Sequence, residues 1–219
     1  MRQLKPNEPI DVGQVMSRLL SQKPDRASFK WDCTRDQAVS ILSACYTAEV
    51  EKRARRCIMD ESTQGHIFNL ACWLTDPTDT HFGVMFIGGV GNGKTTMLHA
   101  LERGYWWMMQ DESFDYQVEH RLDIVNAKDL NNTNKAWRKL GIDDLGTEPV
   151  ETQEYGNIIT MSSDVLAYRY DRHLPTFVTT NLAQRSEDGE TLRDRYGNRL
   201  ADRFNEMFKV IAFYNQSYR

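Results

Sequence analysis

The sequence lacks any apolar run of the roughly 18 to 20 residues that a bilayer-spanning helix requires. It also lacks an apolar stretch behind the charged residues of its first segment, Met1 to Pro6, which a secretory signal would carry. We therefore expect a cytoplasmic protein without a membrane partner.

The four cysteines are spaced too widely for a typical zinc site, because zinc-binding cysteines usually come in pairs about two to four residues apart. Cys33, Cys45, Cys57 and Cys72 contain no such pair, and in the cytoplasm we expect reduced thiols. An excess of positive charge is also missing. The net charge of −4 argues against a protein that coats nucleic acid by bulk electrostatics, but it leaves room for a local basic surface.

The length of 219 residues, with 40% hydrophobic and 26% charged residues, suits one α/β domain with a short N-terminal extension. Three amphipathic helices are predicted first. One starts at Asp11 and places its apolar residues on a single face, at Val12, Val15, Met16, Leu19 and Leu20. A second helix starts near Thr34 and ends in a basic cluster of Lys52, Arg53, Arg55 and Arg56, and a third runs from Thr63 to Leu74.

The apolar periodicity then changes from that of helices to that of alternating strands and helices. Short apolar runs bounded by turn residues predict strands at residues 83–87, 121–125, 140–143, 176–180 and 208–214. A helix is predicted from Lys94 to Met109. Alternating strands and helices favour a parallel sheet with helices on its faces.

A phosphate-binding loop joins the first of these strands to the helix at Lys94. It matches the pattern G-x-x-x-x-G-K-[ST] over Gly88, Gly89, Val90, Gly91, Asn92, Gly93, Lys94 and Thr95, and Thr96 follows. Glycines let successive backbone N–H groups turn towards a polyphosphate, and the helix N-terminus adds a partial positive charge. We expect this loop to bind ATP, with Lys94 on the β- and γ-phosphates and the Thr95 hydroxyl on Mg²⁺.

Two acids end the strand at residues 140–143, as in a Walker B motif. We expect Asp143 to hold Mg²⁺ and Asp144 to orient the attacking water. The segment Asp143-Asp144-Leu145-Gly146 also matches the D-x-x-G motif of GTPases. The N-K-x-D motif that reads guanine is missing downstream, which disfavours GTP, and no L-S-G-G-Q signature points to a transporter ATPase.

Polar residues near the C-terminus complete the candidate site. Asn181 ends the predicted strand at residues 176–180, the position called sensor 1 in AAA+ enzymes, and its amide can both donate and accept hydrogen bonds. The following segment is rich in arginine, which suits charge that develops on phosphate oxygens. Most of these arginines fit a solvated helix face equally well.

Together these motifs resemble the DnaC/IstB group of AAA+ ATPases over residues 60–219. The resemblance rests on the phosphate loop, the segment from Ile142 to Glu148, Arg169 to Asp171, Thr179 to Leu182, Tyr196 to Arg203, and the closing Ser217-Tyr218-Arg219. It implies an AAA+ P-loop core with an abbreviated lid in residues 58–219. Residues 1–57 are expected to form a helical extension, which is a candidate for binding a partner. It also implies that Arg203 is an arginine finger acting on a neighbouring subunit, within a nucleotide-dependent homo-oligomer, and that Arg219 is sensor 2.

The resemblance further implies a partner, either a replicative helicase loaded onto single-stranded DNA or a transposase.

Three departures from the family pattern are visible. Asp144 replaces the usual glutamate, although the IstB branch also has aspartate. The connection before the Walker B strand is short, and residues 1–57 match no known partner-binding domain. Single-stranded DNA is a possible ligand for the basic cluster and for Tyr105, Trp106 and Trp107. A small-molecule kinase and an ATP-binding regulatory module are the remaining alternatives.

Overall fold

The computed structural model describes residues 13, 16–17, 29–149, 161–183 and 189–218. The helix predicted from Asp11 falls largely outside these residues, although Gly13, Met16 and Ser17 are helical. Arg219 also lies outside the described residues.

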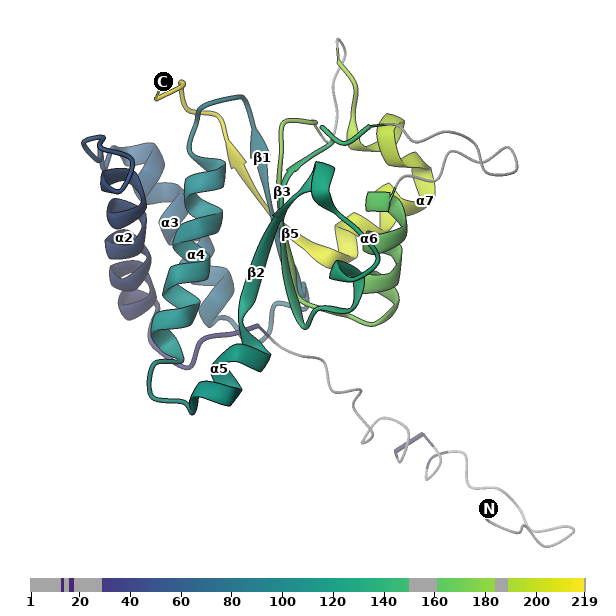
Figure 1. The fold of residues 1–219 in the computed structure, drawn as a ribbon, viewed down its shortest axis with the longest axis horizontal. Coiled ribbons are helices and arrows are strands. Elements are labelled where there is room, and N and C mark those ends of the chain that lie inside the picture. Colours follow the sequence, from purple (N-terminus) through teal and green to yellow (C-terminus); the bar gives the residue numbers. More distant parts are fainter. Residues whose placement is uncertain (1–12, 14–15, 18–28, 150–160, 184–188, 219) are drawn as a thin grey trace, which may run out of the picture.

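A five-stranded parallel sheet forms the centre of the molecule (Figure 1). Its spatial order is β2-β3-β4-β1-β5. The strands are β1 (Gly83–Gly88), β2 (Leu122–Asn126), β3 (Lys139–Leu145), β4 (Thr176–Thr180) and β5 (Phe208–Phe213). The five predicted strands are thus confirmed to within about two residues at each end, and so is the α/β fold class.

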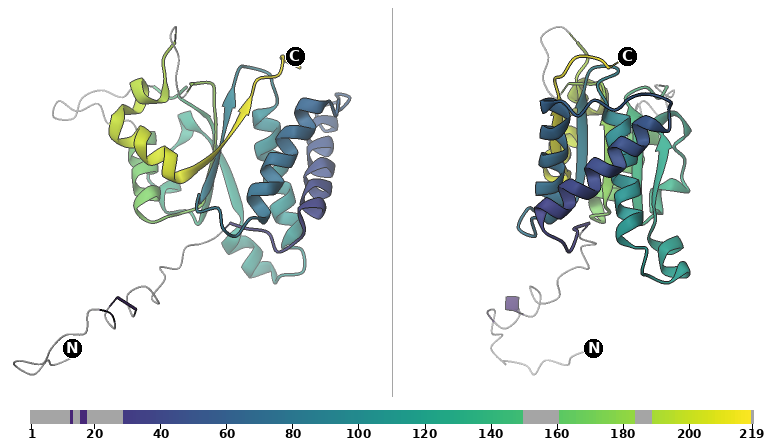
Figure 2. Two further views of the ribbon diagram at one scale, coloured as in Figure 1. Left: turned by 180° about the vertical axis from the view of Figure 1, so that it is seen from behind. Right: turned by 90° about the vertical axis from the view of Figure 1, so that its left-hand side faces the viewer.

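Helices cover both faces of the sheet, as the views in Figures 1 and 2 agree. One face carries α2 (Arg35–Glu51), α3 (Glu61–Thr75) and α4 (Lys94–Met108), and the other carries α6 (Met161–Asp171) and α7 (Leu192–Met207). Side chains alternate along each strand, so Phe86 and Phe177 belong to the first core cluster whereas Met85 and Val178 belong to the second. The first cluster also contains Leu42 of α2, so this helix packs into the same core as α3 and α4.

Local capping explains where the helices begin. Thr34 and Gln37 form a capping box at the start of α2, and the Asp60 carboxylate accepts a hydrogen bond from the Thr63 N–H at the start of α3. The second predicted helix ends earlier than expected, at Glu51. The basic cluster therefore follows the helix instead of forming its last turn, and Ala54 there has a positive φ of 55°.

The sequence analysis missed two kinds of element. One is α5 (Phe114–His120), a helix of two turns with no buried residue. The others are the 3-10 helices η1 (Ala127–Asp129) and η2 (Asn134–Ala136), which fill the connection between β2 and β3.

A buried arginine holds the amino ends of β3 and β4 together. The Arg169 guanidinium donates hydrogen bonds to the carbonyl oxygens of Trp137 (2.7 Å), Pro175 (2.6 Å) and Lys135 (3.3 Å) and to the Thr176 hydroxyl (2.7 Å). Its side chain is fully buried, and burial lowers its pKa to about 9. Arg169 thus gives a donor to the carbonyl oxygens of Lys135 and Trp137, and a second donor to that of Pro175, which also accepts the Leu140 N–H at 3.2 Å.

Candidate nucleotide-binding site

The candidate site lies at the carboxyl edge of the sheet, where β1, β4 and β3 end side by side. Because β4 lies between β1 and β3, Asn181 comes between the phosphate loop and the Walker B acids. This edge is where open parallel α/β sheets usually bind ligands. The strand order therefore brings together motifs that are far apart in the sequence.

Lys94 is held at the centre of the site. Its ammonium group donates hydrogen bonds to the carbonyl oxygens of Gly88 (2.8 Å) and Gly89 (2.6 Å) and to the amide oxygen of Asn181 (2.9 Å). The side chain is 5% exposed. The phosphate-loop lysine and the predicted sensor 1 residue are thus in direct contact.

The backbone of the loop has the form that phosphate binding needs. Gly93 has a φ of 101°, and a Cβ there would lie 2.6 Å from the Tyr46 hydroxyl, so only glycine fits. Helix α4 begins directly behind it with no side chain capping its first N–H groups. These N–H groups and the helix dipole can bind an anion.

The two predicted magnesium ligands are neighbours. The Thr95 hydroxyl donates to an oxygen of the Asp143 carboxylate at 2.9 Å, and the Thr179 hydroxyl donates to the same oxygen at 2.6 Å. Hydroxyl and carboxylate oxygens are the ligands that Mg²⁺ prefers. Thr95 and Asp143 therefore fit a magnesium ion bound with a nucleotide, and Thr179, which the sequence analysis did not single out, orients the carboxylate.

Asp144 occupies an unusual backbone conformation. Its φ is 58°, in the left-handed region, and the pairing of β3 with β4 shifts register between Ile142 and Leu145. The Asp144 N–H donates to the Thr179 hydroxyl at 2.8 Å, which fixes this bulge. Non-glycine residues with such a φ cost free energy and are concentrated at functional sites.

Glu148 is the next acid after Asp144 in the sequence and therefore a second candidate to orient the attacking water, but its side chain is engaged in structural contacts. One carboxylate oxygen accepts the Gly146 N–H at 2.7 Å, and the other accepts the Tyr196 hydroxyl at 2.5 Å. The side chain is buried, and Arg195 donates to the Glu148 carbonyl oxygen. Glu148 thus ties the loop after β3 to α7, and both of its oxygens are already occupied.

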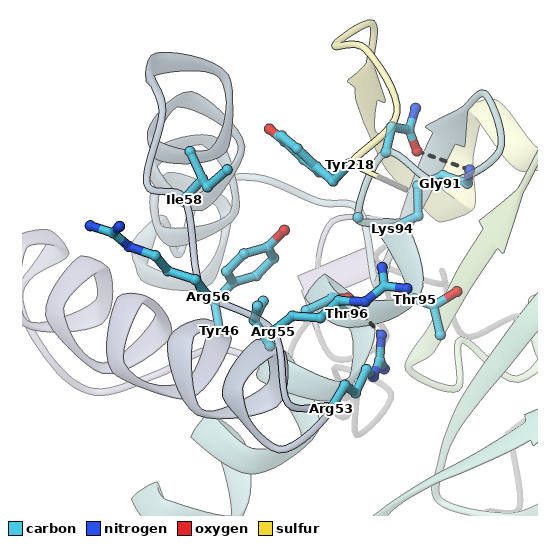
Figure 3. A pocket seen from close by; sticks show the side chains of 13 residues that line it. Tyr46, Arg53, Arg55, Arg56, Ile58, Gly91, Lys94, Thr95, Thr96 and Tyr218 are labelled. Carbon is cyan, nitrogen blue, oxygen red and sulfur yellow. Dashed lines mark hydrogen bonds between the residues drawn. The ribbon is translucent and has the colours of Figure 1, made fainter.

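A cavity of about 340 Å³ opens beside the phosphate loop (Figure 3). Residues 91–96 of the loop and α4 form one wall, and three arginines of the basic cluster belong to the lining. Arg53 donates to the Thr96 hydroxyl at 3.0 Å. The residues that sequence analysis did not place here are Tyr46, Val50, Arg53, Arg55, Arg56, Ile58 and Tyr218.

The C-terminal segment is tied to the phosphate loop. The Tyr218 N–H donates to the Gly91 carbonyl oxygen at 3.0 Å, and its hydroxyl donates to the Asp60 carboxylate at 2.8 Å. Burial alone would raise the pKa of Asp60, but hydrogen bonds from the Thr63 N–H and from hydroxyls outweigh burial and lower it. The Asp60 carboxylate therefore stays ionised at neutral pH and anchors Tyr218 at the cavity.

The candidate arginine finger does not join this site within the chain. Arg203 of α7 pairs with Asp171 at 3.3 Å and lies over the ring of Tyr170, on the far side of the sheet from α4. Arg199, one turn earlier, is exposed and forms no ion pair among the described residues. The structure therefore brings together the loop, Asp143, Asp144 and Asn181, but leaves Arg203 at another surface.

The residues that we considered for DNA binding separate into two groups. The basic cluster lies at the cavity, whereas Trp106 and Trp107 lie at the opposite end of α4 from Lys94.

Among the described residues, no group of three acidic, histidine or cysteine side chains could hold a metal by itself. In the same residues, no helix is long and apolar enough to cross a bilayer.

Neither a family model nor a curated protein sequence matches this chain. Several solved structures do match this chain in fold. The chain is similar in fold to a helicase loader. The DnaC helicase loader shares 19% identity at a TM-score of 0.49, with 72% of this chain and 93% of that chain covered.

DnaI shares 16% identity at a TM-score of 0.44, with 87% of this chain and 99% of DnaI covered. AMPPCP-bound DnaA from Aquifex aeolicus shares 16% identity at a TM-score of 0.47, with 72% of this chain and 48% of that DnaA chain covered. At this level the likeness is one of fold and assigns no activity.

Proposed function

We propose that the protein is an AAA+ ATPase that binds ATP with Mg²⁺ at the carboxyl edge of its sheet. The observation that carries the proposal is the direct linkage of four motif residues: Lys94 with Asn181, and Thr95 with Asp143. A glycine-rich turn that matched the motif by chance would have no reason to meet the other motifs in space. The separate contacts of the P-loop, Walker B and sensor 1 residues support one shared ligand.

The residues divide the work of binding and hydrolysis. The N–H groups at the start of α4 and the Lys94 ammonium bind phosphate oxygens, and Thr95 and Asp143 hold Mg²⁺, which neutralises phosphate charge. Asp144 orients the attacking water, and Asn181 contacts the phosphate or that water. Tyr46, Ile58 and Tyr218 provide the apolar side of the cavity for the base and ribose.

Replacing Lys94 tests nucleotide binding. We expect Lys94→Ala to lower ATP affinity by about tenfold to a hundredfold, because a charge-assisted hydrogen bond contributes about 1.5–3 kcal/mol. Calorimetry with Mg²⁺ and the full chain measures the change. Lys209→Ala is the control, since Lys209 is exposed near the start of β5, at the opposite edge of the sheet from the loop. Equal ATP affinity in the Lys94 variant and the parent contradicts the proposal.

We further propose that ATP switches an assembly that loads a replicative helicase, as the resemblance to DnaC-type proteins implies. Arg203 then acts in trans, which agrees with its position away from its own phosphate loop. The alternative is an IstB-like transposition helper, which Asp144 favours because that branch also has aspartate there. Affinity capture with ATP from the source cells distinguishes the two: recovery of helicase supports loading, and recovery of transposase replaces it.

A further inference from the structure

An exposed aromatic surface lies at the other end of the molecule from the cavity. It consists of the end of α4 and the helix α5, and its members are Trp106, Trp107, Phe114, Tyr116 and Val118. Phe114 is 77% exposed and Trp106 is 60% exposed. Trp106 and Trp107 are neighbours near the end of α4, and α5 begins at Phe114, shortly after α4 ends. Large apolar side chains exposed on consecutive helices mark an interaction site more often than a solvent-facing surface.

Two hollows flank Trp107. One, of about 510 Å³, lies between the start of α2 and the end of α4 and is lined by Asp32, Asp36, Ile41 and Met108 beside Trp107. The other, of about 620 Å³, is also lined by Trp107, together with Ala44, Ala48, Tyr105 and Trp106. Trp107 thus belongs to the lining of two hollows that can accept side chains of a partner.

The charge around the aromatic surface is negative. Asp32, Asp36, Asp111, Glu112 and Asp115 form no ion pair among the described residues. Three of the nearby arginines are paired, Arg103 with Glu49, Arg121 with Asp123 and Arg138 with Glu119. Two further cations form no ion pair among the described residues: Lys139, which lies against the Tyr105 ring, and Arg35, which lies over the Phe68 ring. The unpaired acids outnumber these two cations, so the charge that remains available to a partner is negative.

The negative charge around the aromatic surface indicates which kind of molecule can bind there. Nucleic acid and anionic lipid both carry phosphates, which unpaired carboxylates repel. A second copy that used the same surface would bring identical acids together, which is also unfavourable. Met16 of the chain's own N-terminal segment is 55% exposed, so this residue is not packed against the surface.

We propose that the aromatic surface binds an amphipathic helix of a partner protein, with an apolar face bordered by lysine or arginine. The apolar face packs on Trp106, Trp107 and Phe114, in the helix-in-groove mode. A lysine or arginine enters the hollow of Asp32 and Asp36, where it gains two carboxylates and the face of Trp107. Large aromatic side chains of this kind commonly carry most of the binding energy of an interface.

The aromatic surface is separate from the phosphate loop, although one helix joins them. Helix α4 begins at Lys94 and ends at Met108, a length of about 22 Å at 1.5 Å per residue. The inference therefore stands whether or not the chain hydrolyses ATP. Lys94→Ala should leave peptide binding unchanged, which separates a failure of this inference from a failure of the proposed ATPase function.

The test uses the full chain and three probes: an amphipathic leucine–lysine peptide, its leucine–glutamate counterpart and an oligothymidylate. Tryptophan fluorescence and calorimetry measure their affinities. We expect the lysine peptide alone to bind, and Trp107→Ala and Asp36→Asn each to lower its affinity by about tenfold or more. Phe68→Ala is a matched control, because Phe68 on α3 is 47% exposed, like Trp107. Asp129→Asn is the control for the acid, since Asp129 is exposed on η1.

Several results overturn the inference. One is equal loss of peptide affinity in the Trp107 and Phe68 variants, and another is no binding of the lysine peptide. Oligothymidylate binding that Trp107→Ala abolishes would assign the surface to single-stranded nucleic acid instead. Binding of the lysine peptide only after Leu19→Asp would mean that the chain's own N-terminal residues occupy the surface.

Discussion

The two edges of the sheet differ in how their polar groups are used. At the carboxyl edge, Lys94 bonds to Asn181 and Thr95 bonds to Asp143, and Lys94 and Thr95 also line a cavity that contains three arginines. At the amino edge, Arg169 bonds to backbone carbonyls and is fully buried, and the neighbouring surface on α4 and α5 is aromatic and acidic. The carboxyl edge has the chemistry of an anion site. The amino edge has a buried structural arginine and an acidic surface on α4 and α5.

This difference follows from the direction of the strands. In a parallel sheet every strand ends at the same edge, so the loops that carry polar residues gather there. The N-terminus of α4 points to the same edge and favours negative charge, whereas its C-terminus points to the other edge. The same helix thus contributes to the proposed phosphate site at one end and to the proposed surface for a basic partner at the other.

The largest expected effect concerns Arg203. This residue belongs neither to the candidate nucleotide site at the carboxyl edge nor to the aromatic surface at the amino edge. Arg203→Ala should lower ATP turnover by about 10³- to 10⁵-fold where subunits assemble, the range known for arginine fingers. ATP affinity of the monomer should stay unchanged, because Arg203 contacts Asp171 and Tyr170. Steady-state turnover measured against protein concentration tests this.

Mixing the Arg203→Ala and Lys94→Ala chains should restore part of the turnover, since mixed assemblies contain one intact interface. Arg193→Ala, on the same helix, is the control and should change turnover little, because Arg193 pairs with Asp202 at the surface. Absence of rescue in mixed oligomers contradicts the trans role, and Arg199 is then the next residue to test. Arg219→Ala, in contrast, should weaken the nucleotide response of its own chain.

Asp144 is expected to have the next largest effect. Asp144→Asn keeps the volume but removes the charge, so turnover should fall by about 10²- to 10⁴-fold while ATP affinity changes little. Single-turnover hydrolysis and calorimetry separate the two quantities. Glu148→Gln is the comparison variant. If turnover survives in Asp144→Asn and is lost in Glu148→Gln without unfolding, the water-orienting acid is Glu148.

Arg169 should matter for stability rather than for nucleotide binding. Arg169→Ala removes the Arg169 donor from partly buried carbonyl oxygens and from the Thr176 hydroxyl and opens a cavity, so we expect the free energy of unfolding to fall by about 3–5 kcal/mol. Urea unfolding measures it. Arg172→Ala is the control, because Arg172 lies on the surface over the Tyr168 ring. A loss below about 1 kcal/mol would show that Arg169 is dispensable.

The smallest effect concerns the anchor of the C-terminal segment. Tyr218→Phe keeps the ring in the cavity but loses the hydrogen bond to Asp60, worth about 0.5–1.5 kcal/mol, so ATP affinity should fall only a few-fold. Tyr214→Phe is the control, since Tyr214 is 91% exposed. Nucleotide titration of both variants tests the anchor, and identical affinities would argue that Asp60 does not position Tyr218.

Much of the carboxyl edge could be predicted from the sequence. The phosphate loop, Asp143, Asp144 and Asn181 are recognisable because each follows a short apolar run that predicts a strand, and strand ends in parallel sheets converge. The basic cluster was harder. Its arginines look like a solvated helix face, and only the end of α2 at Glu51 and the packing of α2 on α4 bring them to the cavity.

The sequence by itself determined the local chemistry of this protein: a loop that can bind phosphate, acids and an amide at strand ends, and a parallel α/β order. The tertiary structure alone decided which of the remaining polar residues are structural. Arg169, Glu148 and Tyr218 have partners at sequence distances that no periodicity encodes, because their hydrogen bonds cross between strands, loops and helices. It also decided that the aromatic residues of α4 face away from the basic cluster, since two ends of one helix must lie at opposite edges of the sheet.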